Sequence, residues 1–271
     1  MHVKTTPSIL SLLLGLSLLA GCASAPSLSQ LKSSLTPIAP VARGDANSIK
    51  AHEQLLQKAK QGRIDVYFMG DSITRRWGAT DYPQFLAHWN ENFHGWNAGN
   101  FGWGADSVEH MLWRIENGEL EGVNPKVIVL LGGTNNVGDG SGGDQTVEHV
   151  VRGIQTLLVR SHEMAPDATI VLMAIFPRND NPGANALINR INQRISKFAD
   201  GKQVRFLNLN DQLASPDGTL REGMAVDNLH LGLPGYTVWA EALKPIFTEV
   251  LGPPAAEDKA PPPTGDPSAQ R

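Results

Sequence analysis

The sequence predicts an α/β protein of three layers, in which helices cover both faces of a five-stranded parallel sheet. Short β-branched or aromatic-rich runs alternate along the chain with longer amphipathic runs, a pattern typical of parallel strands joined by helices. The chain has 271 residues, of which 41% are hydrophobic and 18% are charged. This composition suits one ordinary globular domain, and we find no internal repeat and no second domain.

The predicted elements follow one another from residue 49 to residue 250. The run VIVLL at 127–131 is the clearest strand, because a short, continuous apolar run is typical of a strand buried on both faces. The other strands are shorter or more mixed in composition. In order, we expect a helix at 49–61, strands at 64–69, 95–100 and 127–131, a helix at 146–163, a strand at 169–175, a helix at 184–198, a strand at 204–209 and a helix at 234–250.

The N-terminus has the features of a bacterial lipoprotein signal. Lys4 precedes the apolar run ILSLLLGLSLLA, which is too short to span a bilayer but suits a signal peptide over residues 1–21. The run ends in LAGC, which resembles a lipobox, so Cys22 is the predicted lipidation site. An ordinary secretory signal with a chance cysteine is the alternative. Cys22 is the only cysteine, which excludes a disulfide within the chain.

Both ends of the remaining chain are expected to lie outside the domain. Residues 22–47 are rich in Ser, Ala and Pro without apolar periodicity, which predicts a flexible tether. Residues 252–271 carry PP and PPP with a few charges, a composition that predicts a disordered tail. The domain is therefore expected to span residues 48–251.

The charge and the spacing of ligand residues argue against several function classes. The net charge is -4, with 23 basic residues scattered among 27 acidic ones, so no nucleic-acid partner is expected. The sequence has no HxH, HExxH or Cys/His cluster, so neither a metal nor another cofactor is expected.

Polar and small residues follow the predicted strands at four places. In open parallel sheets, binding and catalytic sites form beyond the carboxyl ends of the strands. These four places are therefore where we expect the chemistry. They are Gly70-Asp71-Ser72, Gly102, Thr134-Asn135-Asn136 and, before the last helix, Asp227-Asn228-Leu229-His230.

Ser72, Asp227 and His230 are the candidate catalytic residues. A serine hydroxyl needs a base within hydrogen-bond reach and a third group that orients that base. Asp227 lies three residues before His230, so both side chains can project from one side of a turn toward Ser72. The alternatives are structural: Gly-Asp-Ser is also a common capping turn, and the Asp/His pair could cap the last helix. The absence of GxSxG around Ser72 argues against the α/β-hydrolase fold.

Acyl transfer also needs hydrogen-bond donors for the oxygen that becomes negative in the tetrahedral intermediate. The candidates are the Ser72 backbone N–H at a helix start, the Asn135 side-chain amide, and Gly102, where the backbone can approach a ligand closely. Asn135 could instead form an Asx turn, and Gly102 a tight turn.

The four places together resemble a known family. The segments GDSI, NFGWGADS, GGTNN and DNLHLG occur in the order of blocks I, II, III and V of the SGNH (GDSL-like) hydrolases. From about His52 to Leu251 the chain is similar to the group of platelet-activating-factor acetylhydrolase catalytic subunits. The resemblance implies a flavodoxin-like α/β/α fold, a Ser72-His230-Asp227 triad, and an oxyanion hole made by Ser72, Gly102 and Asn135.

Two positions depart from the usual family pattern. Trp103 stands beside the predicted oxyanion glycine, where we expect the indole to narrow the acyl pocket. Asn136 stands where many members carry Asp, a change that the acetylhydrolase group tolerates.

These observations predict a serine esterase that acts on short, acetyl-type esters and is a carbohydrate acetylesterase of the cell envelope. Ala23 after the lipobox cysteine resembles the outer-membrane sorting pattern of Gram-negative bacteria. The expected partners are a glycan or small-molecule ester and the membrane, through the lipid anchor, and a homodimer is left open. The alternatives are a lipase or lysophospholipase acting on longer chains, and a glycan-binding lipoprotein without catalysis.

Overall fold

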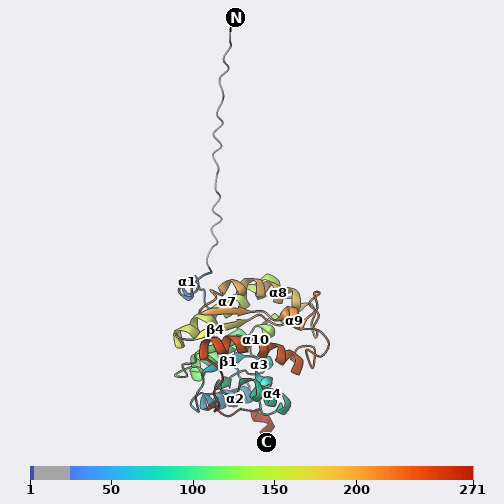
Figure 1. The fold of residues 1–271 in the computed structure, drawn as a ribbon. Helices are drawn as coiled ribbons and strands as arrows, with labels where there is room; N and C mark the ends of the chain where they lie inside the picture. Colours follow the sequence, from blue (N-terminus) through green and yellow to red (C-terminus); the bar gives the residue numbers. More distant parts are fainter. Residues whose placement is uncertain (3–24, 271) are drawn as a thin grey trace.

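A five-stranded parallel sheet forms the centre of the computed structural model, which describes residues 1–2 and 25–270 (Figure 1). The strand order is β2-β1-β3-β4-β5, with every neighbouring pair parallel. The predicted fold class is therefore confirmed. The strands are β1 (Val66–Gly70), β2 (Ala98–Asn100), β3 (Val127–Leu131), β4 (Thr169–Met173) and β5 (Val204–Leu207).

All five predicted strands are present, but several are shorter than predicted. β4 ends at Met173, where its pairing with Leu207 of β5 also ends. Two residues beyond the end of β4, the Asn192 side chain hydrogen-bonds to the backbone of Ile175. It accepts from the Ile175 N–H at 2.8 Å and donates to the Ile175 carbonyl at 2.9 Å. A side chain from a distant helix therefore replaces the sheet partner, which a local pattern does not reveal.

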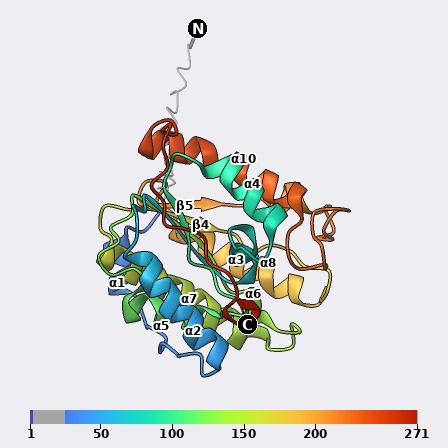
Figure 2. The same cartoon turned by 90° about the horizontal axis from the view of Figure 1, so that it is seen from below.

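Helices cover both faces of the sheet, and Figure 2 shows α4 and α10 on one side of the strands and α2, α5 and α7 on the other. Alternate residues of each strand face opposite layers, so Tyr67 and Met69 join one apolar cluster while Val66 and Phe68 join the other. The helices are α1 (Leu28–Ser33), α2 (Ala46–Ala59), α3 (Ser72–Trp77), α4 (Pro83–Phe93), α5 (Val108–Arg114), η1 (Ile115–Glu119), α6 (Thr134–Val137), α7 (Gly143–Met164), α8 (Ala184–Ile195), η2 (Ser196–Phe198), α9 (Asn210–Leu213), α10 (Leu233–Leu251) and η3 (Pro267–Gln270).

The segment predicted as a flexible tether packs against the domain. Leu28 and Leu31 of α1 are buried in the cluster beneath α7, and the Gln155 side chain donates to the Leu31 carbonyl at 2.8 Å. Two leucines three residues apart provide enough apolar surface to dock one short helix turn. The predicted signal peptide beyond residue 2 and Cys22 lie outside the described residues.

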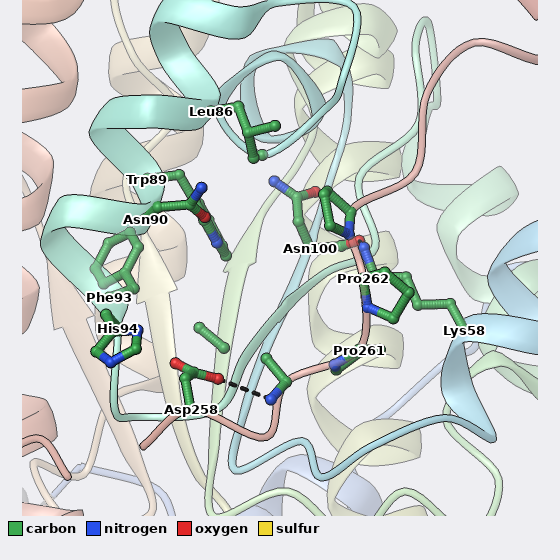
Figure 3. Close-up of a pocket in the computed structure, with 14 residues that line it drawn as sticks. Lys58, Leu86, Trp89, Asn90, Phe93, His94, Asn100, Asp258, Pro261 and Pro262 are labelled. Carbon is green, nitrogen blue, oxygen red and sulfur yellow. Dashed lines mark hydrogen bonds between the residues drawn. The ribbon is translucent and has the colours of Figure 1, made fainter. Parts of the chain in front are cut away.

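The C-terminal segment, predicted as disordered, also lies against the domain. It runs from the end of α10 along the edge of the sheet toward α2 (Figure 2). The Ala255 N–H donates to Gly95 O at 2.9 Å, and the Lys259 carbonyl accepts from the Arg63 N–H at 2.8 Å. Residues between the prolines supply these hydrogen bonds, and extended proline-rich chain suits the cover of a sheet edge. Figure 3 shows the pocket of about 330 Å³ that this segment forms with α4.

Candidate active site

Ser72 is the first residue of α3, and only Asp71 separates it from the end of β1. The buried Asp71 carboxylate accepts a hydrogen bond from the Ile73 N–H at 2.9 Å and so caps the helix. Within the described residues, the Ser72 N–H has no hydrogen-bond acceptor. The turn predicted from the sequence therefore places a hydroxyl and a free backbone donor together at the carboxyl edge of the sheet.

The structure brings Ser72, His230 and Asp227 into one hydrogen-bonded chain. His230 Nε2 lies 2.8 Å from Ser72 Oγ, across 158 residues of sequence. On the other side of the ring, Nδ1 lies 2.9 Å and 2.8 Å from the two carboxylate oxygens of Asp227. A proton on Nδ1, held by the carboxylate, leaves Nε2 free to accept the serine proton, which is the arrangement that activates a serine.

Burial and the neighbouring Arg76 charge favour the neutral form of His230. Burial lowers the pKa of His230 and the nearby Arg76 guanidinium lowers it further, whereas Asp227 and Asp180 oppose the shift. Partial burial acts to raise the pKa of Asp227, but hydrogen bonds from His230, the His230 charge and a hydrogen bond from Arg76 outweigh it and hold that pKa at about 2. Near neutral pH, the pair is therefore a carboxylate beside an unprotonated imidazole.

Asn135 lies in α6, directly after the loop that follows β3. Its side-chain Nδ2 donates to the Asp106 carbonyl at 2.8 Å. An amide group carries two N–H bonds, so this contact orients the group and leaves one donor for a ligand. The structure therefore gives Asn135 the geometry expected of a preorganised donor.

Gly102 does not offer the backbone donor that the sequence suggested. Its N–H donates to the Asn100 side-chain oxygen at 3.0 Å. A Cβ at this position would lie 2.6 Å from the Arg75 backbone nitrogen and 2.9 Å from the Asp71 carbonyl oxygen. Glycine is therefore needed for close packing against α3. The Gly102 N–H is thus engaged by the neighbouring Asn100 side chain.

Ala105, three residues further on, is the exposed member of the same loop. Its φ is +60°, an uncommon conformation for a residue with a Cβ. In the part of the chain that the structure describes, its N–H has no acceptor. The sequence signal was weak, because Ala105 stands in a turn where glycine would be expected.

Comparison with known proteins identifies the family of this chain. The sequence profile of the GDSL-like lipase/acylhydrolase family matches residues 68–238. The chain belongs to this family. It is similar to platelet-activating factor acetylhydrolase IB subunit alpha1 of Bos taurus, with 32% identity over 234 residues that cover 86% of this chain and 95% of that protein. Subunit alpha2 of Rattus norvegicus is 31% identical over 214 residues, 77% of this chain and 87% of that protein.

A solved structure shows the same fold. A GDSL-like lipase from Bacteroides thetaiotaomicron matches with a TM-score of 0.59 at 19% identity, covering 74% of this chain and 98% of that chain. The family match and the similarity to the acetylhydrolase subunits confirm the predicted family, and the chain is an ester hydrolase.

A buried ionic cluster supports the loop between β2 and α5 in this acylhydrolase. We call residues 101–107 the glycine loop. Arg114 Nε lies 2.7 Å from Asp106 Oδ2, and its other nitrogens donate to Glu119 at 2.5 Å and to the Phe101 carbonyl at 2.8 Å. Burial raises the pKa of Asp106 to about 6, although Arg114 opposes the shift. Sequence reasoning missed this cluster, because these charges resemble those of an ordinary exposed helix.

Trp103 does not take the position that we predicted. Its indole Nε1 donates to Ser48 Oγ of α2 at 2.9 Å, and the Arg75 guanidinium lies 4.9 Å from its ring centroid. The side chain is thus buried against α2 and fixes the glycine loop to that helix. The expectation that the indole narrows the acyl pocket is not supported by these contacts.

Arg76 is a further residue of this acylhydrolase that the motifs did not indicate. Its Nη1 lies 3.0 Å from Asp227 Oδ2, the oxygen that His230 Nδ1 also contacts at 2.8 Å. Nothing in the sequence joins these positions, which are 151 residues apart.

The described residues contain no group of three or more His, Cys, Asp or Glu side chains arranged to hold a metal ion. In residues 1–2 and 25–270, no helix is long and apolar enough to cross a membrane.

Proposed function

We propose that this acylhydrolase is a serine esterase that removes short acyl groups, acetyl above all, through an acyl-enzyme intermediate. The hydrogen-bonded chain from Ser72 through His230 to Asp227 is the observation that carries the proposal. Ser72 Oγ attacks the ester carbonyl carbon while its proton passes to His230 Nε2. The same proton then goes to the departing alcohol, and water, activated by His230, releases the acid and restores Ser72.

Three donors stabilise the tetrahedral oxyanion in this proposal. They are the Ser72 N–H, the free N–H of the Asn135 side chain, and the Ala105 N–H in place of that of Gly102. Each lacks a competing protein acceptor in the described structure, and such preorganised donors contribute most of the stabilisation in many acyl-transfer enzymes.

An acetylated carbohydrate is the substrate that we propose. Relatives that bear the name acetylhydrolase support a small acyl group. The envelope location predicted from the N-terminus supports a polysaccharide as the alcohol part.

Two exposed apolar residues favour a second candidate: Val226 is 57% exposed and Leu233 is 40% exposed, on either side of the Asp227/His230 pair. They offer apolar surface to a longer acyl chain, as a lipase would require.

Hydrolysis of nitrophenyl acetate, butyrate and octanoate by the purified protein and its Ser72→Ala variant tests the proposal. We expect the wild type to have its highest kcat/KM on acetate, and the variant to have a kcat/KM lower by roughly 10⁴-fold or more. A maximum on octanoate would favour the lipase. Activity that persists in Ser72→Ala would reject the proposed nucleophile.

We also propose that the protein is anchored in the cell envelope through a lipidated Cys22. The support is the signal-like sequence before this cysteine. Fractionation of cells that express Cys22→Ser should move the protein from the membrane to the soluble fraction. Unchanged membrane association would contradict the anchor.

A further inference from the structure

The segment between α1 and α2, residues 34–45, lies against the glycine loop although it is outside the family match at residues 68–238. Arg43 makes the contact. Its Nη1 donates to the Gly104 carbonyl at 3.1 Å and lies 3.6 Å from Asp106 Oδ1, while its Nη2 lies 3.0 Å from Asp45 Oδ2. One side chain therefore contacts the residue before Ala105 and the residue after it.

Both of these neighbours matter for the proposed oxyanion donors. The Asp106 backbone carbonyl accepts a hydrogen bond from the Asn135 side-chain amide, so the position of Asp106 sets the orientation of that amide. Gly104 and Asp106 together determine where the Ala105 N–H points. Ala105 has a φ of +60°, and such a conformation persists only where the surroundings hold it.

The glycine loop is thus held from two sides. Arg114 holds it from within, and its guanidinium and the Asp106 carboxylate are buried. Arg43 holds it from the surface, with 25% of its side chain exposed. Because Asp106 is fully buried, its charge needs a cationic partner, and a planar guanidinium can serve a carbonyl and a carboxylate at once.

We propose that Arg43 is a positioning residue for catalysis, which holds the glycine loop so that the Ala105 and Asn135 donors meet the oxyanion. The proposal rests on the proposed function, since it assigns the loop a part in the same acyl transfer. Arg43 does not touch the reacting atoms. Its loss should therefore lower kcat while KM and the folded state change little.

Arg152 provides a matched control. From α7 it donates to the carbonyls of Thr36 at 2.9 Å and Pro37 at 3.2 Å, in the same segment but not at the glycine loop. Arg152→Met removes an equal charge and loosens the docking of the segment. Arg43→Met also removes one positive charge and loosens the segment, but in addition it removes the contacts with the Gly104 carbonyl and the Asp106 carboxylate.

The experiment compares wild type, Arg43→Met, Arg43→Lys and Arg152→Met on nitrophenyl acetate. We expect Arg43→Met to lower kcat by about 10-fold to 100-fold, because small misplacements of catalytic groups have effects of this size. Arg43→Lys should retain part of the kcat that Arg43→Met loses. Added methylguanidinium should raise the kcat of Arg43→Met and of none of the other three proteins. Arg152→Met should keep the wild-type kcat. All four proteins should have similar Tm values.

Amide hydrogen exchange of the peptide covering residues 101–107 gives a readout that does not depend on activity. It should accelerate in Arg43→Met and not in Arg152→Met. If wild type hydrolyses no ester but exchange responds as expected, the proposed function fails while the contact between Arg43 and the loop stands. Equal kcat in Arg43→Met and wild type, or an equal loss in Arg152→Met, would overturn the positioning role.

Discussion

The two sides of the active site are built in different ways. The histidine loop, residues 221–232, carries Asp227 and His230. Its own backbone closes it, with Val226 N–H to His230 O at 2.8 Å and Gly232 N–H to Met224 O at 2.9 Å, and the Asn228 carbonyl accepts from the Asn179 N–H at 2.7 Å. The Asp227 side chain is 44% exposed. The glycine loop instead lies over a buried ionic cluster in which Asp106 and Glu119 are fully buried.

This difference predicts which substitutions should lower activity alone and which should also lower stability. An exposed side chain of the histidine loop can be lost with little effect on the core, so such changes should affect chemistry more than folding. A buried charge that loses its partner remains desolvated, so changes beneath the glycine loop should affect folding as well. The glycine-loop donors thus lie over a buried ionic support, whereas the Asp227 carboxylate that orients the base is exposed to solvent.

The largest effect is expected at the nucleophile. Ser72→Ala should lower kcat/KM by roughly 10⁴-fold or more, because the triad acts as a unit. Urea unfolding should show little loss of stability, since the Ser72 side chain serves the site and not the core. A large loss of stability would show that the Ser72 side chain also supports the fold.

The next effect concerns the buried cluster. Arg114→Met should lower the free energy of unfolding by about 3–5 kcal/mol, because Asp106 and Glu119 are left buried without their main partner. Urea denaturation measures the change. As a control, Arg205→Met breaks a partly exposed pair with Glu249 and should lose less than about 1 kcal/mol. Similar losses in both variants would contradict a special role for burial.

Asn135→Ala should lower kcat by about 100-fold to 1,000-fold, the usual effect of losing one oxyanion donor. KM should change little, because the donor acts mainly on the transition state. Asn117→Ala, which removes an exposed amide in η1, is the control. A change confined to KM would assign Asn135 to substrate binding.

The smallest effect is a shift in pH dependence. Arg76→Met removes a positive charge beside His230, so the pKa of His230 should rise and its neutral form should require a higher pH. The acid limb of kcat/KM should therefore move to higher pH, with nearly full activity above it. Arg205→Met, which removes the same charge far from the site, should leave the profile in place. A shift of the acid limb to lower pH would show that the Arg76 charge does not lower the pKa of His230.

The sequence predicted the sheet and most of the site because these depend on local patterns. Val127–Leu131 is continuously apolar, which suits a strand buried on both faces, and the observed bounds agree. Ser72 and Asn135 follow such strands, so their place at the carboxyl edge follows from the parallel topology. The three-residue spacing of Asp227 and His230 allowed one turn to present both.

What the sequence by itself determined was therefore the layered fold, the family, and the residues at the strand ends. Tertiary structure alone decided that the Gly102 amide is taken by Asn100, that Arg43 and Arg114 meet at Asp106, and that both terminal segments pack on the domain. The physical reason is that strand and turn preferences act between neighbours in the chain. The partner of a buried charge or backbone donor is whichever group the fold brings near, at any distance in sequence.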